Sequence, residues 1–234
     1  MFTRLQDKML NIISIFIFIN SIISCQHYSY SDASPDGIGK IYHEREISKV
    51  MGHLGAPWLE RYSRKNEEKP DLAVDLLQLK KDMVVADLGA GTGYFTYRMA
   101  QKCSIVYAVD IQQEMLDLNA KQMKKKNINN VKFILGTKDK TRLPANSFDL
   151  VLLVDVYHEL EYPYEIMKDI KQSLNDSGKV VLLEYRKEDP NVPIKPLHKM
   201  SIDQVVKEMN FIGLNLHLNI KKLPRQHMLV FSKS

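Results

Sequence analysis

The chain has 234 residues, of which 44% are hydrophobic and 26% charged, with 10 glycines and 9 prolines. This is the composition of a packed globular protein, and it excludes collagen-like, disordered and disulfide-stapled chains. Lysine and arginine number 33 against 28 acidic residues, a net charge of +5 at pH 7. So small a surplus of positive charge gives no support for a nucleic-acid partner. The length fits one large domain.

The amino terminus has the form of a secretory signal over residues 1–24. Arg4 and Lys8 precede an uncharged apolar run at residues 10–23. That run of 14 residues would span about 21 Å as a helix, whereas a bilayer core measures roughly 30 Å. An export signal therefore fits better than a permanent anchor. The alternative is a buried apolar helix in a cytosolic protein.

The end of this run, Ser24-Cys25, resembles the lipobox of bacterial lipoproteins, in which the cysteine is lipidated and the preceding residues are removed. The resemblance implies lipidation of Cys25, a location in the cell envelope and membrane contact only through the lipid. A cytoplasmic location is the alternative. Residues 25–40 are rich in Ser, Asp, Gly and Pro, so we expect them to form a flexible tether. Residues 41–70 are expected to form a lid or a packed extension.

From about residue 71 to residue 234, strand-like and helical patterns alternate. This order predicts repeated βα units around a parallel sheet, in one domain. Short Val/Leu/Ile-rich runs predict buried strands at 83–88, 104–110, 131–136, 148–154 and 179–185. Helices are predicted near 93–102, 112–126 and 163–174. Cys103, beside a strand, is expected to be a small buried hydrophobe.

The pattern changes after the fifth strand. A helix is predicted near 201–211, followed by strands at 214–220 and 227–232. Only Lys221 to Gln226 separate these two strands. A parallel crossover needs a dozen or more residues, so the two strands must form an antiparallel pair.

A glycine-rich loop lies between the first strand and the first helix of this domain. It contains Asp87, Gly89, Gly91 and Gly93. Glycines permit positive φ and close approach of a ligand, and the N–H groups that begin a helix suit an anion. Asp110 closes the next strand, 17 residues after Gly93, where a carboxylate can accept hydrogen bonds from ribose hydroxyls. The pair indicates an adenosine-containing ligand. The alternatives are a helix cap for Asp87 and a turn carboxylate for Asp110.

The spacing distinguishes two such ligands. Dinucleotide sites use G-x-G-x-x-G, whereas this loop reads G-x-G-x-G with an acid two residues ahead. That carboxylate would repel a pyrophosphate and attract an ammonium, which favours S-adenosylmethionine (SAM) over NAD. From about residue 71 to residue 231 the sequence resembles the class I SAM-dependent methyltransferases. The resemblance implies a Rossmann-like α/β fold, with a seven-stranded mostly parallel sheet, an antiparallel last strand and helices on both faces.

The resemblance also implies roles for individual residues. Four residues would surround the methionine part of SAM: Asp87, Gly89, Gly91 and Gly93. Asp110 would bind the ribose, and Ile111 would lie beside the adenine. Asp139 is assigned to the adenine amino group, although the chain departs from the family pattern there, because Thr137 follows the glycine of that segment.

The fourth strand leads into a polar segment that contains Asp155 and His158. Strand carboxyl ends line the ligand crevice of open α/β sheets. Methyl transfer is an in-line displacement that depends mostly on placing the nucleophile, and a base is needed only if the nucleophile starts protonated. We predict that Asp155 contacts the SAM amino group and that His158 accepts a proton. A structural role for His158 is the alternative. Other polar residues expected on the same side are Glu184, Tyr185, Arg186, His198 and Lys199.

The sequence thus predicts methyl transfer from SAM to an unidentified acceptor, expected to be a small molecule, with no metal. The alternative is a lipid-anchored, non-catalytic protein that keeps the methyltransferase fold and binds SAM or a nucleoside. It is motivated by location, because SAM is made in the cytosol whereas the lipobox directs the chain outward.

Overall fold

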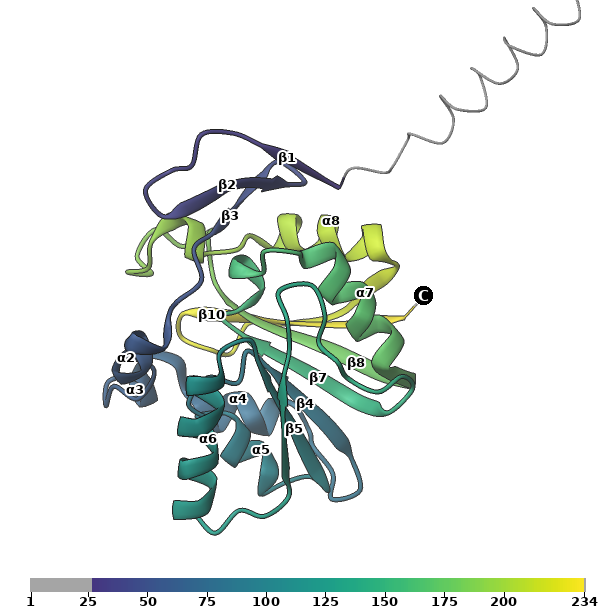
Figure 1. Ribbon diagram of the computed structural model, residues 1–234. Coiled ribbons are helices and arrows are strands. Elements are labelled where there is room, and N and C mark those ends of the chain that lie inside the picture. Colours follow the sequence, from purple (N-terminus) through teal and green to yellow (C-terminus); the bar gives the residue numbers. More distant parts are fainter. Residues whose placement is uncertain (1–26, 234) are drawn as a thin grey trace, which may run out of the picture.

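The computed structural model describes residues 27–233 (Figure 1). The predicted signal and Cys25 lie outside the described residues. The described chain forms a three-stranded sheet and a seven-stranded sheet. None of the helices between residues 27 and 233 is long and apolar enough to cross a membrane.

The seven-stranded sheet has the order β6-β5-β4-β7-β8-β10-β9. Its strands are β4 (Val84–Leu88), β5 (Ile105–Asp110), β6 (Val131–Leu135), β7 (Phe148–Val154), β8 (Leu174–Tyr185), β9 (Leu214–Ile220) and β10 (Gln226–Lys233). Strands β4 to β8 pair in parallel, and β10 runs antiparallel to both β8 and β9. The predicted fold class and the antiparallel pair of last strands are confirmed.

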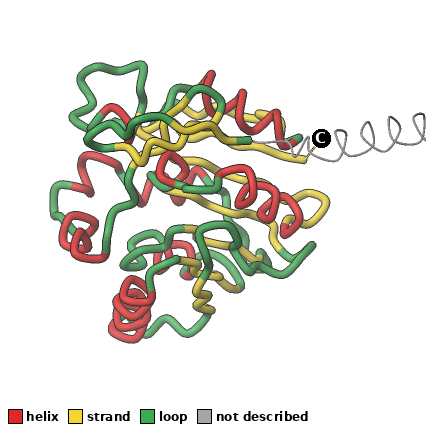
Figure 2. The backbone as a smooth tube through the Cα atoms, turned by 45° about the horizontal axis from the view of Figure 1, so that its top comes forward, coloured by secondary structure: helices red, strands yellow, loops and turns green. Residues whose placement is uncertain are grey.

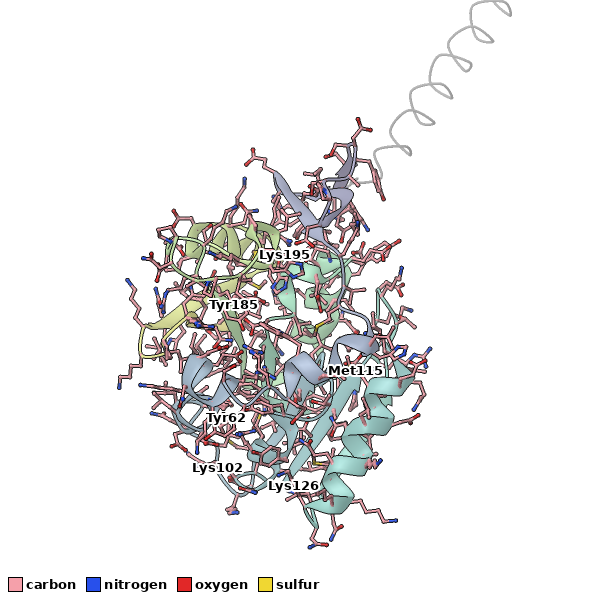
Figure 3. All side chains as sticks on the ribbon, turned by 90° about the vertical axis from the view of Figure 1, so that its left-hand side faces the viewer. Tyr62, Lys102, Met115, Lys126, Tyr185 and Lys195 are labelled. Carbon is pink, nitrogen blue, oxygen red and sulfur yellow. The ribbon has the colours of Figure 1, made fainter. Side chains whose placement is uncertain are left out.

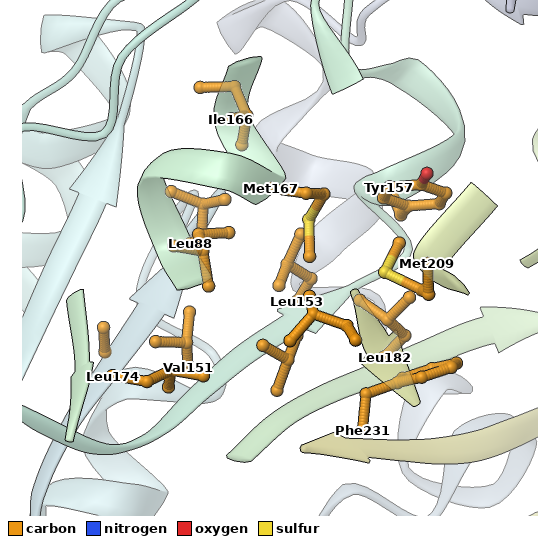
Figure 4. Close-up of a cluster of buried hydrophobic side chains, with 14 of the residues drawn as sticks. Leu88, Val151, Leu153, Tyr157, Ile166, Met167, Leu174, Leu182, Met209 and Phe231 are labelled. Atoms are coloured by element: carbon orange, nitrogen blue, oxygen red, sulfur yellow. The ribbon is translucent and has the colours of Figure 1, made fainter. Parts of the chain in front are cut away.

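Helices cover both faces of this sheet, and two hydrophobic cores result (Figure 2). On one face, α7 and α8 pack through side chains such as Met167 and Met209 against Leu153, Leu182 and Phe231 (Figure 4). On the other face, α4 and α5 pack on the opposite side chains of the same strands. Both faces are therefore buried, which explains the continuous apolar runs of the strands. The helices are α4 (Pro70–Leu76), α5 (Thr96–Ala100), α6 (Gln113–Lys125), α7 (Pro163–Ser173) and α8 (Ile202–Ile212).

One strand and one helix start three or more residues from the predicted position, whereas the other predicted elements of this domain start within one residue of it. β8 starts at Leu174 instead of residue 179, with a register shift against β7 between Phe148 and Leu150. α5 starts at Thr96 instead of residue 93, because the glycine loop occupies the residues before it. Cys103 is 4% exposed, as expected of a small buried hydrophobe, and burial raises the pKa of its thiol to about 11.

The predicted tether is wrong from residue 28 onwards. Three antiparallel strands form there: β1 (Tyr28–Tyr30), β2 (Gly37–Tyr42) and β3 (Arg45–Ser48). Tyr28 donates a hydrogen bond to Glu165 of α7, and the Lys40 ammonium lies 3.3 Å from the centre of the Tyr162 ring. These partners lie more than a hundred residues away in the sequence, so local composition does not reveal what orders the segment.

The strand order of the large sheet reverses beside β4, because β5 lies on one side of it and β7 on the other. Ligands of open α/β sheets bind at such a switch point, outside the carboxyl ends of the strands. Three further segments line the space above these ends. The first comprises η1 (His53–Gly55), α2 (Ala56–Leu59) and α3 (Arg64–Glu68), and the other two are the short helices η2 (Tyr157–Glu159) and η3 (Pro196–His198).

Candidate functional site

A cavity of about 770 Å³ lies over the carboxyl ends of β4, β5, β7 and β8. Its size is in the range of small-molecule sites, roughly 300–1,000 Å³. Met115 of α6, Tyr185 of β8 and Lys195 ahead of η3 belong to its wall and are labelled in Figure 3. Six predicted site residues line it: Gly89, Gly91, Asp110, Ile111, Asp155 and His158. The structure therefore brings together residues that lie up to 69 positions apart in the sequence.

The glycine loop turns sharply at the end of β4. Gly89 has φ +69°, and a Cβ placed on it would lie 2.4 Å from a methyl carbon of Val156. Gly91 has φ +50°, and its Cβ would lie 3.0 Å from Leu59 Cδ1. L-residues rarely adopt such backbone angles. The loop thus requires glycine where it meets the segment after β7 and where it meets α2.

The Asp110 carboxylate accepts hydrogen bonds from the backbone of this loop and of the turn after β5. Its Oδ2 accepts a hydrogen bond from the Gly91 N–H at 2.9 Å, and its Oδ1 accepts one from the Gln112 N–H at 2.9 Å. The side chain is buried, and burial raises its pKa. An ionised carboxylate has about four lone-pair sites, so two remain for hydroxyl donors in the cavity. This geometry suits the predicted contact with a ribose.

Three predicted site residues do not line the cavity: Asp87, Gly93 and Asp139. A Cβ on Gly93 would meet the amide of Asn119, so this glycine allows α6 to pack closely. Asp139 is exposed, and its carboxylate accepts a hydrogen bond from the Thr137 hydroxyl at 2.8 Å. The positions of these three residues do not support direct contact with the cofactor.

Substitutions of Asp110 and Asp139 compare an acid that lines the cavity with one that does not. We expect Asp110→Ala to weaken binding of S-adenosylhomocysteine roughly 5–150-fold, the equivalent of about 1–3 kcal/mol for a hydrogen-bonded charged partner. Asp139→Ala should change the affinity less than twofold, because its carboxylate lies outside the cavity. Titration calorimetry measures both. Equal losses in the two variants would contradict the placement of the adenosine beside Asp110.

Asp87 is 2% exposed, and its Oδ2 accepts a hydrogen bond from the Thr96 hydroxyl at 2.6 Å. The carboxylate therefore lies behind the glycine loop. Burial raises its pKa from 3.8 to about 6. The folded state accordingly holds this proton to a higher pH than the unfolded state, and ionisation of Asp87 costs stability as the pH rises through that window.

We expect Asp87→Asn to be more stable than the wild type at pH 8, by about 1–3 kcal/mol for a shift of this size. The gain should disappear below about pH 3, where Asp87 is protonated in both states. Urea unfolding of the two proteins at pH 8 and about pH 3 measures the difference. A variant less stable at pH 8 would show that the ionised carboxylate stabilises the fold.

Asp155 follows β7 in an unusual conformation, with φ +53°. Its Oδ2 accepts a hydrogen bond from the Gln226 amide at 2.7 Å. Its Oδ1 is buried and has no hydrogen-bond partner among the described residues. Burial and the nearby Glu68 and Glu184 carboxylates raise its pKa well above the usual value. A buried oxygen without a protein donor can accept a hydrogen bond from water or from a ligand. The ammonium of a bound SAM would supply such a donor, so the residues fit this cofactor.

His158 lies in η2 and lines the cavity. Its Nδ1 is 2.6 Å from Glu184 Oε2, and its Nε2 is 3.1 Å from Nδ1 of His198. Burial disfavours the charged imidazole, but the Glu184 carboxylate outweighs this and raises the pKa of His158. The histidine is therefore held firmly in the wall. Its action as a base stays a prediction.

The segment ahead of β4, expected to form either a lid or a packed extension, forms part of the cavity wall. Leu59, Arg61 and Arg64 line the cavity. Arg64 pairs at 2.7 Å with Glu68, which also accepts a hydrogen bond from Tyr185 at 2.8 Å. No local sequence signal marks Glu68 as a partner of Tyr185, because 117 residues separate them.

Comparison with known proteins agrees with this geometry. Residues 86–182 match the family model described as "Methyltransferase domain". The chain is 24% identical over 120 residues to an uncharacterised methyltransferase of Bacillus subtilis, covering 51% of this chain and 47% of the relative. It is 24% identical over 168 residues to the "Probable cobalt-precorrin-6B C(15)-methyltransferase (decarboxylating)" of Methanocaldococcus jannaschii, covering 69% and 81%. The chain thus spans about half the length of the first of these relatives.

A solved structure has the same fold. A SAM-dependent methyltransferase from Aquifex aeolicus superposes with a TM-score of 0.72 at 21% identity, covering 78% of this chain and 98% of that one. The family match, the relatives and this fold all point to one assignment. Residues 86–182 match the methyltransferase-domain family, the described chain has the fold of the class I SAM-dependent methyltransferases, and these similarities imply S-adenosylmethionine as the cofactor.

Proposed function

We propose that the protein transfers the methyl group of SAM to a small-molecule acceptor bound in the same cavity. One observation carries this proposal. Besides the glycine loop and Asp110, the cavity wall holds a second group of polar side chains: Glu159, His158 and His198. SAM supplies an electrophilic methyl group when bound. The chain's own residues would hold the cofactor at the first group and the acceptor at the second, away from bulk water.

A small molecule fits this region better than a macromolecule. Ile38 and Lys49 of the N-terminal segment line the cavity on the side facing η3. An acceptor must therefore fit between this segment and the sheet. The small net charge of +5 also offers little to attract a polyanion.

The test uses the purified full-length protein. Calorimetry with S-adenosylhomocysteine measures cofactor binding, and incubation of a small-molecule cell extract with methyl-labelled SAM measures transfer. We expect label in a low-molecular-weight product only when the protein is present. Tight binding without any labelled product would favour the non-catalytic binding protein. Absence of binding would contradict methyl transfer and leave only a nucleoside as the ligand of the non-catalytic protein.

We further propose that Cys25 is lipidated and that the domain is anchored to the cell envelope. The support is the order of charged start, apolar run, Ser24 and Cys25. Every described element follows Cys25 in the sequence, so removal of residues 1–24 would delete none of them. Lipid labelling of the wild type should be lost in Cys25→Ser. A wild type that stays unlabelled and keeps Met1 would contradict the anchor.

A further inference from the structure

Three side chains with metal-binding atoms meet in the wall of the cavity. His158 and Glu159 come from η2, and His198 comes from η3. One ligand atom from each lies within 4.8 Å of the others. All three residues line the cavity. The chain thus brings two imidazoles and one carboxylate together across 40 residues of sequence.

A carboxylate holds the outer nitrogen of each imidazole. His158 Nδ1 lies 2.6 Å from Oε2 of the buried Glu184. His198 Nε2 lies 3.0 Å from Asp36 Oδ2, a buried oxygen that has no hydrogen-bond partner among residues 27–233, so this contact is an ion-pair distance and not an aligned hydrogen bond. A carboxylate accepts hydrogen bonds and does not donate them when ionised. In neutral imidazoles, the two carboxylates therefore favour the proton on the outer nitrogen.

When both rings are neutral with their protons on the outer nitrogens, the inner nitrogens face each other as two acceptors. His158 Nε2 and His198 Nδ1 are 3.1 Å apart, and neither neutral ring has a proton left to donate to the other. A cation bound to both lone pairs would turn this repulsion into attraction. Zinc binds histidine nitrogen at about 2.0–2.1 Å, so one ion can reach both atoms at an angle of roughly 100°.

We propose that His158, His198 and Glu159 bind a divalent transition-metal ion, for which zinc is the best match. Two neutral imidazoles and one carboxylate are a common zinc ligand set with an open fourth position. Carboxylates that hold the outer nitrogens are the usual support of histidine ligands. Glu159 accepts a hydrogen bond from the Met51 N–H at 3.0 Å, which orients its carboxylate.

The charge around these ligands favours a dication. The carboxylates of Asp36, Glu159 and Glu184 lie at or beside the two histidines. Arg45, the cation next to the His158 carbonyl, is already paired with Glu208. The exposed Lys195 pairs with the other oxygen of Asp36 at 2.7 Å. No local pattern in the sequence indicates a metal, because the two histidines are far apart in the chain and have no zinc-motif spacing.

The metal site and a base role for His158 exclude each other, because a nitrogen bound to a metal cannot accept a proton. The site itself does not depend on methyl transfer. Zinc binding can therefore be measured without SAM, and failure of one proposal leaves the other standing.

Calorimetry with zinc on tag-free full-length protein, stripped with a chelator, tests the inference. We expect one zinc ion per chain in the wild type. His198→Ala and Glu159→Gln should each weaken zinc binding at least tenfold. The matched control is His217→Ala, which removes an exposed histidine of β9 outside the cavity and should bind zinc as the wild type does.

Circular dichroism and binding of S-adenosylhomocysteine verify that each variant is folded. Zinc binding that is equally tight in the wild type and in His198→Ala would overturn the site. So would an equal loss in His217→Ala, or absence of zinc binding by a wild type that still binds S-adenosylhomocysteine. In this last case, the two inner nitrogens would share a proton instead of a metal ion.

Discussion

Gly91→Val should abolish SAM binding while leaving most of the fold intact. The glycine has φ +50° and lies in the cavity wall, where its N–H donates to Asp110. A branched side chain would occupy the space in which the cofactor approaches the backbone. Its Cβ would also lie 3.0 Å from Leu59 Cδ1. The backbone strain should cost about 1–2 kcal/mol of stability, since residues with a Cβ disfavour this conformation.

Calorimetry with S-adenosylhomocysteine and thermal unfolding measure the two effects separately. Gly52→Val is the matched control, because Gly52 has φ −70° and open space around its Cβ position. It should keep both affinity and stability. Gly91→Val combined with Leu59→Ala removes the contact with α2. If this double variant regained wild-type affinity, the loss would come from the displaced α2 and not from exclusion of the cofactor.

Glu208→Ala should destabilise the folded protein strongly. Glu208 is fully buried on α8, and its two oxygens accept hydrogen bonds from Arg45 at 2.8 and 3.0 Å. The Tyr157 hydroxyl donates to it at 2.6 Å. Without Glu208, the buried Arg45 guanidinium keeps its charge and loses its partner. Breaking such a pair costs about 3–5 kcal/mol, which lowers the thermal midpoint of a chain of this size by roughly 6–20 °C.

The same substitution should loosen the N-terminal sheet, because Arg45 links β3 to α8. Thermal unfolding measures the stability, and limited proteolysis detects release of the segment ahead of β4. Glu44→Ala is the control, since the Glu44 side chain is 85% exposed and pairs only with the surface Lys207 among the described residues. It should leave the midpoint unchanged. A similar loss in both variants would contradict a special role for the buried pair.

The sequence alone predicts the large sheet, because the information that specifies it is local. Each strand, such as 148–154, is a short apolar run buried on both faces, and each helix has its own periodicity. The antiparallel end of the sheet follows from the length of one loop. The glycine loop and Asp110 can also be recognised locally, because positive φ and a carboxylate after a strand depend on residue type at a fixed spacing.

Only the tertiary structure decides which polar side chains share the cavity. Asp87 and Asp110 both come at strand ends, yet Asp87 turns toward Thr96 while Asp110 faces the ligand space. The N-terminal strands are held by partners that are distant in the sequence, such as Glu208, which binds Arg45 across 163 residues. The pairing of His158 with His198 likewise requires η2 and η3 to be placed side by side. Such contacts depend on the packing of distant elements, which no local pattern in the chain encodes.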